Sequence, residues 1–173
     1  MRELVIVDGY NLIFHQEMVK ETANLEHARE RLLNQLAQYA ALTGVKVVVV
    51  FDAYRVKGGR EQTWQRGGLT VIFTAEGEAA DTVIERLSSQ LGSYWNVSVV
   101  TADAAEQRLV WGYGALRVSP REFSARVGEV LQRSQEEVRG LSRPGDDYLE
   151  NRLAEDVRAI LARWRRGKKG DES

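Results

Sequence analysis

Residues 4–11 read LVIVDGYN, and this stretch decides the fold. Its four apolar residues, three of them β-branched, are followed at once by Asp8 and Gly9, as expected of a short strand buried on both faces. A charged group is costly to bury, so a carboxylate placed where such a strand ends indicates a function. Asp8 is therefore the first candidate site residue.

The same arrangement recurs twice along the chain. The apolar run at 47–51 ends in Asp52, and the run at 97–102 ends in Asp103. In an open sheet of parallel strands, ligand sites form outside the carboxyl ends of the strands. We therefore expect these three aspartates to meet at one edge of the sheet.

Length and composition indicate one globular domain. The chain has 173 residues, of which 43% are hydrophobic and 28% charged, and its formal net charge is -1. It contains no cysteine, which excludes disulfides, thiolate catalysis and cysteine-ligated zinc. No apolar stretch approaches the roughly 20 residues that span a bilayer, and the first strand leaves no room for a signal peptide. We expect a cytoplasmic protein with no membrane partner.

Strand and helix patterns alternate along the chain. Short apolar runs predict strands at residues 4–7, 45–51, 69–73, 97–101 and 115–118. Apolar residues spaced three and four apart predict helices over 25–40 and 79–91, with a shorter helix after Asp103. We expect an α/β fold with three layers, α/β/α, around a mostly parallel central sheet.

Two breaks divide the C-terminal part of the chain. The residues SPRE at 119–122 have the pattern of a capping box, in which the serine caps a helix and the glutamate reaches back to it. The residues RPG at 143–145 then interrupt the chain before a last amphipathic helix and a basic tail. We expect a main domain over 1–140, and a C-terminal helix and tail over 141–173 that pack on the domain or extend from it.

A fourth acid, Asp81, begins the helix that follows the third of these strands. Acids are ordinary in a first turn, and an aspartate at a strand end often only caps the next helix, so each acid alone is a weak indication. Four carboxylates at one edge, however, would repel one another unless a divalent cation neutralised them. Mg²⁺ prefers carboxylate oxygens and water, and such a site can promote phosphodiester hydrolysis.

Other chemistries lack their residues. The chain has no GxxxxGK[ST] loop, and its only histidines, His15 and His27, have no G-x-S-x-G elbow to serve. An aspartyl phosphatase usually has a second aspartate two residues after the first, where this chain has Tyr10. His15 lies near Asp8 in sequence and could contact a substrate.

The segment 54–68 is rich in basic, aromatic and glycine residues, and we expect a mobile loop there. Basic groups neutralise phosphates and aromatic rings stack on bases, although an ordinary solvated loop is the alternative. We favour RNA contact through Tyr54, Arg55, Lys57, Arg60, Trp64 and Arg66.

These motifs together resemble a known family. The stretches VIVDGYNLI, VVVVFDAYRVKGG, GLTVIFTAEGEAADTVIER and VSVVTADAAEQRLVWGYGALRVSPREF, in order over residues 3 to 130, resemble the YacP-like family of NYN domains, within the PIN-like nuclease group. The resemblance implies an α/β nuclease domain with an acidic pocket and RNA cleavage that depends on Mg²⁺ or Mn²⁺. The YacP-like branch is associated with bacterial endoribonucleases that act on mRNA in connection with the ribosome.

The resemblance also implies roles for individual residues. Asp8, Asp81 and Asp103 would bind the metal. Asn11 would orient Asp8 or a phosphate, and Asp52 would support the site with a lesser claim to direct ligation. The favoured function is thus a metal-dependent endoribonuclease. The alternative is a non-catalytic RNA- or ribosome-binding module with the same fold, in which the acids are only helix starts and turns.

Overall fold

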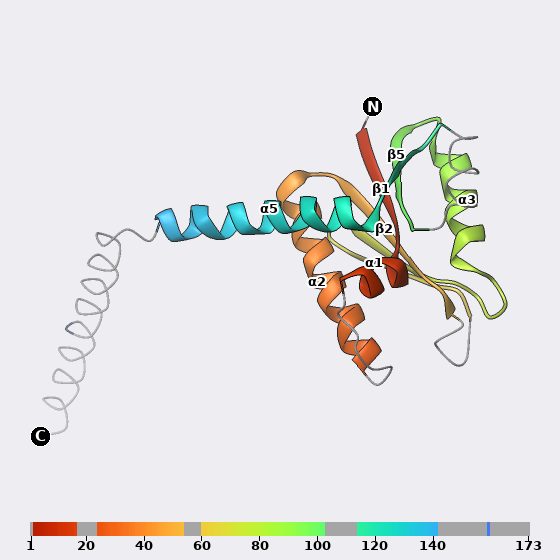
Figure 1. The fold of residues 1–173 in the computed structure, drawn as a ribbon, viewed down its shortest axis with the longest axis horizontal. Coiled ribbons are helices and arrows are strands. Elements are labelled where there is room, and N and C mark those ends of the chain that lie inside the picture. Colours follow the sequence, from red (N-terminus) through yellow and green to blue (C-terminus); the bar gives the residue numbers. More distant parts are fainter. Residues whose placement is uncertain (1, 17–23, 54–59, 103–113, 142–158, 160–173) are drawn as a thin grey trace, which may run out of the picture. The chain divides into compact units, whose positions relative to one another are not determined.

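The computed structural model describes residues 2–16, 24–53, 60–102, 114–141 and 159 (Figure 1). The elements in chain order are β1 (Arg2–Asp8), α1 (Gly9–His15), α2 (Leu25–Thr43), β2 (Lys46–Phe51), β3 (Gln62–Arg66), β4 (Leu69–Phe73), α3 (Ala80–Leu91), β5 (Trp95–Val100), β6 (Leu116–Val118) and α5 (Pro120–Leu141). The chain divides into two compact units, residues 1–132 and 133–173, and the site and sheet described below belong to the first. The predicted division into 1–140 and 141–173 stays a prediction, and the predicted last helix and the helix after Asp103 lie outside the described residues.

One sheet of six strands organises the described part of the chain, in the order β3-β4-β2-β1-β5-β6. Every neighbouring pair is parallel except β3 and β4, which are antiparallel. The register aligns the strand ends, because Asp8 pairs with Val50 across β1 and β2, and Val7 pairs with Val100 across β1 and β5. The predicted α/β fold with a mostly parallel sheet is confirmed.

The strand order reverses at β1. From β1 the sheet extends through β2 and β4 on one side, and through β5 and β6 on the other. Ligand sites of open α/β sheets form outside the carboxyl ends of strands at such a switch point. The crevice between the ends of β1 and β5 is therefore the favoured position for a site.

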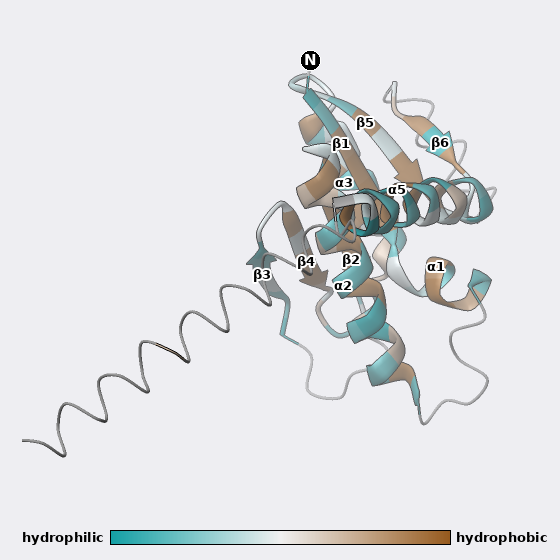
Figure 2. Cartoon of the chain, turned by 90° about the vertical axis from the view of Figure 1, so that its left-hand side faces the viewer, coloured by the Kyte–Doolittle hydropathy of each residue, from teal (hydrophilic) through white to brown (hydrophobic). Residues whose placement is uncertain are grey.

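Helices cover both faces of the sheet (Figure 1). Val5 and Val7 point to one face and pack with α1, α2 and the first half of α5, whereas Leu4 and Ile6 point to the other and pack with α3. This double burial explains the nearly unbroken apolar runs of the strands. Figure 2 shows β1 changing from hydrophilic at its start to hydrophobic further on, and hydrophilic residues along α2 and α5. No helix among the described residues has the length and apolar character needed to cross a membrane.

The helix ends agree closely with the sequence. Gly44 ends α2 in the left-handed conformation, with φ 73°, and its N–H bonds to the carbonyl of Ala40. The hydroxyl of Ser119 accepts the N–H of Glu122 at 3.1 Å, so the serine half of the predicted capping box is present. The Glu122 carboxylate forms an ion pair with Arg126 at 3.5 Å.

Two elements differ from the expectation. The loop predicted over 54–68 is wrong for residues 62–66, which form β3 and pair with β4 through a two-residue turn, Gly67-Gly68. Gly67 has φ 58°, a conformation that glycine adopts readily, and two glycines between paired runs are a hairpin signal. The polar sequence QTWQR concealed the strand, because an edge strand needs no apolar run. The short helix α1 was also not predicted.

Gly9 allows α1 to begin directly after β1. A Cβ placed on Gly9 would overlap the ring of Phe51, which ends the neighbouring strand β2. The Phe51 ring is fully buried and packs edge-on against Tyr10, with ring centroids 5.2 Å apart. The chain therefore needs glycine here for close packing rather than for an unusual backbone conformation.

Gly9→Ala is expected to lower the free energy of unfolding by about 1–3 kcal/mol, since the added methyl overpacks the core against Phe51. Gly128→Ala is the matched control: its Cβ would meet nothing within 4 Å, and alanine stabilises a helix interior by roughly 0.5–1 kcal/mol. Urea unfolding of both variants checks this. Changes of the same sign in the two variants would contradict the packing role of Gly9.

Candidate active site

Asp8 lies at the junction of β1 and α1 and is almost fully buried, with 6% of its surface exposed. Its carboxylate accepts the backbone N–H of Asn11 at 3.3 Å and so caps α1. Asp8 therefore has a structural role, as many strand-end aspartates do. A cap does not need to be buried, however, so capping alone does not explain the position of this charge.

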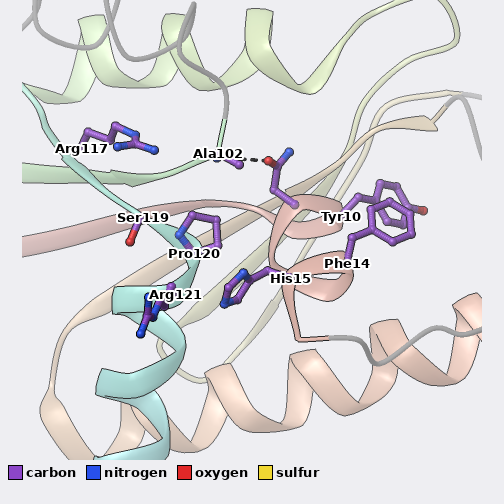
Figure 3. A pocket seen from close by; sticks show the side chains of 9 residues that line it. Tyr10, Phe14, His15, Ala102, Arg117, Ser119, Pro120 and Arg121 are labelled. Atoms are coloured by element: carbon purple, nitrogen blue, oxygen red, sulfur yellow. Dashed lines mark hydrogen bonds between the residues drawn. The ribbon is translucent and has the colours of Figure 1, made fainter.

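The side chain of Asn11 links the two strand ends at the switch point. Its Oδ1 accepts the backbone N–H of Ala102, just beyond β5, at 3.1 Å (dashed line in Figure 3). The same side chain lies close enough to the Asp8 carboxylate at the end of β1 to lower its pKa. Because the Oδ1 of Asn11 accepts from Ala102, the Nδ2–H₂ group of Asn11 is the one that can donate to Asp8. Asn11 therefore lies beside Asp8, and its predicted role in orienting Asp8 or a phosphate stays a prediction.

The electrostatic environment of Asp8 disfavours its ionised form. Burial raises the pKa of the Asp8 carboxyl above its ordinary value, and the hydrogen bonds from Asn11 lower it only in part. The negative charges of Asp81 and Asp52 raise the pKa further. The structure thus places Asp81 and Asp52 within electrostatic range of Asp8.

Asp52 and Asp81 reach this edge from different elements. Asp52 directly follows β2 and is half-buried, whereas Asp81 lies in the first turn of α3 and is exposed. The last predicted acid, Asp103, lies outside the described residues. Among the residues that the structure does describe, no group of three acids or histidines is close enough to hold a metal ion by itself.

Thr74 connects the segments that carry Asp52 and Asp81. Its fully buried hydroxyl accepts the N–H of Ala53 at 2.9 Å and donates to the carbonyl of Glu78 at 2.8 Å. Ala53 is the neighbour of Asp52, and Glu78 lies just before α3. One hydroxyl therefore connects two acid-bearing segments, and no sequence motif marks Thr74 for this role.

The predicted RNA-binding residues that the structure describes, Arg60, Trp64 and Arg66, do not lie at a single edge of the sheet. Because β3 runs antiparallel to β4, its start pairs with Phe73 at the carboxyl edge and its end pairs with Leu69 at the opposite edge. The exposed Arg60 precedes β3 and so lies toward the edge that carries the acids. Tyr54, Arg55 and Lys57 lie outside the described residues.

Trp64 and Arg66 are more firmly held than a loop would allow. Trp64 is half-buried against the core, whereas a ring in the predicted mobile loop would be exposed. The guanidinium of Arg66 lies over the Trp64 ring, 5.4 Å from its centroid, and donates to Asn34 on α2 at 2.9 Å. Arg66 also lies 3.7 Å from a carboxylate oxygen of Glu30.

A pocket of about 520 Å³ lies beside the acids, between α1 and the start of α5 (Figure 3). Asn11 and His15 line it from α1, Ala102 from the end of β5, and Arg117 from β6. Of these lining residues, only Asn11 and His15 are candidates from the sequence alone. The signal that could have found the rest is the SPRE motif, because a helix cap directly after a parallel strand lies at the same edge as the acids.

Comparison with known proteins shows which family this chain belongs to. The model of the YacP-like NYN domain matches residues 5–166. The chain belongs to the YacP-like NYN domain family. It is 37% identical to the uncharacterized protein YacP of Bacillus subtilis (strain 168), over 95% of this chain and 98% of that protein.

Solved structures of a family member have the same fold. The crystal structure of Rae1 (YacP) from Bacillus subtilis matches with a TM-score of 0.72 and 36% identity, covering 96% of each chain. The W164L mutant of the same protein matches with a TM-score of 0.70 and 35% identity, covering 81% of this chain and 84% of that one. Membership in this NYN family supports a nuclease-type function related to RNA.

The acids of this NYN domain suit a hard divalent cation. The negative charges of Asp81 and Asp52 add to the effect of burial in raising the pKa of the Asp8 carboxyl, so these charges repel that of Asp8. A cation at this edge would relieve that repulsion, and carboxylate oxygens are the ligands that Mg²⁺ and Mn²⁺ prefer. The described acids do not form a metal site by themselves, so binding of Mg²⁺ or Mn²⁺ stays an expectation that also requires Asp103.

Thr74→Val is expected to lower the free energy of unfolding by about 1–3 kcal/mol, since it leaves the N–H of Ala53 and the carbonyl of Glu78 unpaired in the interior. Ser88→Ala is the control, because the buried Ser88 hydroxyl donates only to the carbonyl of Ile84 within α3, and its loss should cost less. Denaturant unfolding measures both. Thr74→Ser should restore most of the stability, and an equal loss in all three variants would show that Thr74 makes no special connection.

Asp8→Asn is expected to stabilise the protein at pH 7 by roughly 0.5–2 kcal/mol, because asparagine keeps the cap but removes a buried charge. A carboxyl whose pKa is raised by folding favours the fold when protonated, and this contribution is lost as the pH rises through the folded pKa. The gain should therefore shrink as the pH falls. Thermal unfolding in EDTA from pH 4 to 8 tests this, with Glu3→Gln at the exposed start of β1 as the control. A destabilised Asp8→Asn variant at pH 7 would contradict the electrostatic account.

Proposed function

We propose that the protein is a metal-dependent endoribonuclease that hydrolyses phosphodiester bonds of RNA. The observation that carries the proposal is the buried Asp8 carboxylate at the switch point of the sheet, with its pKa raised by burial, by Asp81 and by Asp52. An asparagine would cap α1 as well and would avoid the buried charge. The chain therefore keeps a charge that the fold itself does not need.

Asp8, Asp81 and Asp103 would hold the ion, with Asp52 in support. Bound Mg²⁺ or Mn²⁺ supplies an activated water and neutralises the charge that develops on the phosphate. Asn11 holds the Asp8 carboxylate in one orientation while its oxygen is occupied by Ala102. Asn11 also lines the adjacent pocket, so it can direct a substrate phosphate as well as the carboxylate.

A polymeric substrate suits this edge better than a small molecule does. The acids lie near the middle of the sheet, at β1, and the exposed Arg60 lies beyond them toward β3. Basic groups placed along an edge can follow the phosphates of a strand. We extend the proposal to mRNA, with the ribosome as partner, because the family resemblance implies it.

The alternative is a non-catalytic module that binds RNA or the ribosome. It is favoured by the fact that Asp8 caps α1 and that Asp81 occupies the first turn of α3, where an acid interacts well with the helix dipole. This alternative predicts that binding survives loss of the acids. It also predicts that binding fails when Arg55, Lys57, Arg60 and Trp64 are changed together.

Asp8→Asn and Asp81→Asn are each expected to reduce RNA cleavage roughly 100-fold or more, because each removes a carboxylate from the proposed ion site. The assay follows labelled mRNA with and without Mg²⁺ or Mn²⁺, and with and without translating ribosomes. EDTA should abolish cleavage by the unchanged protein. Asp103→Asn tests the acid that lies outside the described residues.

Glu3→Gln is the matched control, since it removes an exposed carboxylate from the other end of the same strand. It should cleave at the rate of the unchanged protein. Equal cleavage by the unchanged protein and Asp8→Asn would sink the nuclease assignment. RNA binding without cleavage in every condition would favour the alternative, and cleavage only with ribosomes would identify the partner.

A further inference from the structure

Two arginines line the pocket between α1 and the start of α5, and none of the proposed metal ligands does. Arg117 reaches it from β6 and Arg121 from α5, and His15 faces them from the end of α1 (Figure 3). No acid is among the described residues that line it. Within the described part of the chain, no ion pair joins either arginine to a carboxylate. A pocket with such a lining attracts anions.

The arginines differ in how they are held. The Nε of Arg117 donates to the backbone carbonyl of Thr101 at 3.2 Å, which fixes the guanidinium beside the end of β5. The terminal nitrogens of Arg117 remain as donors in the fork geometry that suits phosphate oxygens. Arg121 is exposed in the first turn of α5, whose positive dipole end adds to the charge.

Asn11 forms the wall between this pocket and the acids. It lines the pocket, while its side chain contacts the Asp8 carboxylate and the N–H of Ala102. The volume of about 520 Å³ lies within the range of roughly 300–1,000 Å³ usual for small-ligand sites. A group of nucleotide size therefore has room directly beside the proposed reaction centre.

We propose that this pocket binds a backbone phosphate of the RNA strand next to the phosphate that is cleaved, through Arg117 and Arg121. The proposal rests on the proposed function, because it takes the acids as the reaction centre. The order of the strands favours a polymer: the pocket lies on the β5 and β6 side of Asp8, and Arg60 lies on the β4 and β3 side. An RNA strand crossing the edge would meet the pocket, the acids and Arg60 in turn.

The test measures RNA binding separately from cleavage. Full-length protein carrying Asp81→Asn is titrated, in EDTA, into a fluorescently labelled single-stranded oligouridylate, and anisotropy gives the Kd. In this background we compare Arg117→Ala/Arg121→Ala with Arg2→Ala/Lys46→Ala. The second pair also removes two positive charges, but at the amino ends of β1 and β2, on the opposite edge of the sheet.

The pocket pair should weaken binding about tenfold or more, and the control pair should change it little. The slope of log K against log salt should also fall by about 0.7 for each phosphate that the protein no longer neutralises, as counterion release from single strands requires. Circular dichroism checks folding. Because Arg121 is exposed, Arg121→Glu keeps the test decisive if the double variant unfolds, and it should weaken binding as well.

Equal binding by the pocket and control pairs would overturn the proposal, as would normal binding by Arg121→Glu. Inorganic phosphate and uridine monophosphate are the competitors that distinguish a strand from a free anion. If either displaced the RNA as effectively, mole for mole, as an unlabelled oligonucleotide, the pocket would be a site for small phosphates and the proposal would fail. Failure of the proposed function would be recognised by a different result. The Asp81→Asn variant would then cleave RNA in Mg²⁺ or Mn²⁺ at the same rate as the unchanged protein.

Discussion

The hydrogen bonds of Asn11 are the interaction on which the rest of the site depends. Its side chain joins the carboxylate at the end of β1 to the backbone just beyond β5, across the crevice where the strand order reverses. The hydrogen bond to Ala102 holds the Asn11 side chain beside the Asp8 carboxylate. The same residue forms one wall of the pocket, so the acidic and basic parts of the edge share a single rigid divider.

The surrounding packing supports this arrangement from below. Phe51 fills the space beside Gly9, and the glycine allows α1 to start directly after β1. Asn11, in the first turn of α1, therefore lies close to the strand ends. Thr74 performs a similar task on the other side, where its hydroxyl ties the end of β2 to the segment before α3. The strand ends that carry the acids are therefore joined to neighbouring segments by hydrogen bonds. Such a network can hold like charges close together, because local relaxation would break buried hydrogen bonds.

The sheet and its acidic edge could be predicted from sequence because both follow from short-range patterns. A β-branched run ending in aspartate identifies a buried strand and its carboxyl end, and the topology of parallel sheets brings those ends together. The strand β3 was not predicted, because its pairing depends on a two-glycine turn and on the neighbouring strand rather than on its own polar residues. Thr74 and Arg117 escaped for a related reason. Their contacts join segments far apart in sequence, and nothing local marks a threonine or an arginine as part of a site.

In the antiparallel edge strand β3, the end that sets the register is different from the end that faces the acids. The two-residue turn at Gly67-Gly68 sets the register of β3 at the edge away from the acids, while the longer connection from β2 enters β3 at the edge that carries them. The connection can change in sequence or in length without shifting the hairpin, because the turn at Gly67-Gly68 fixes the register of β3. In evolutionary terms, this leaves the connection free to change while the sheet and the acids stay as they are.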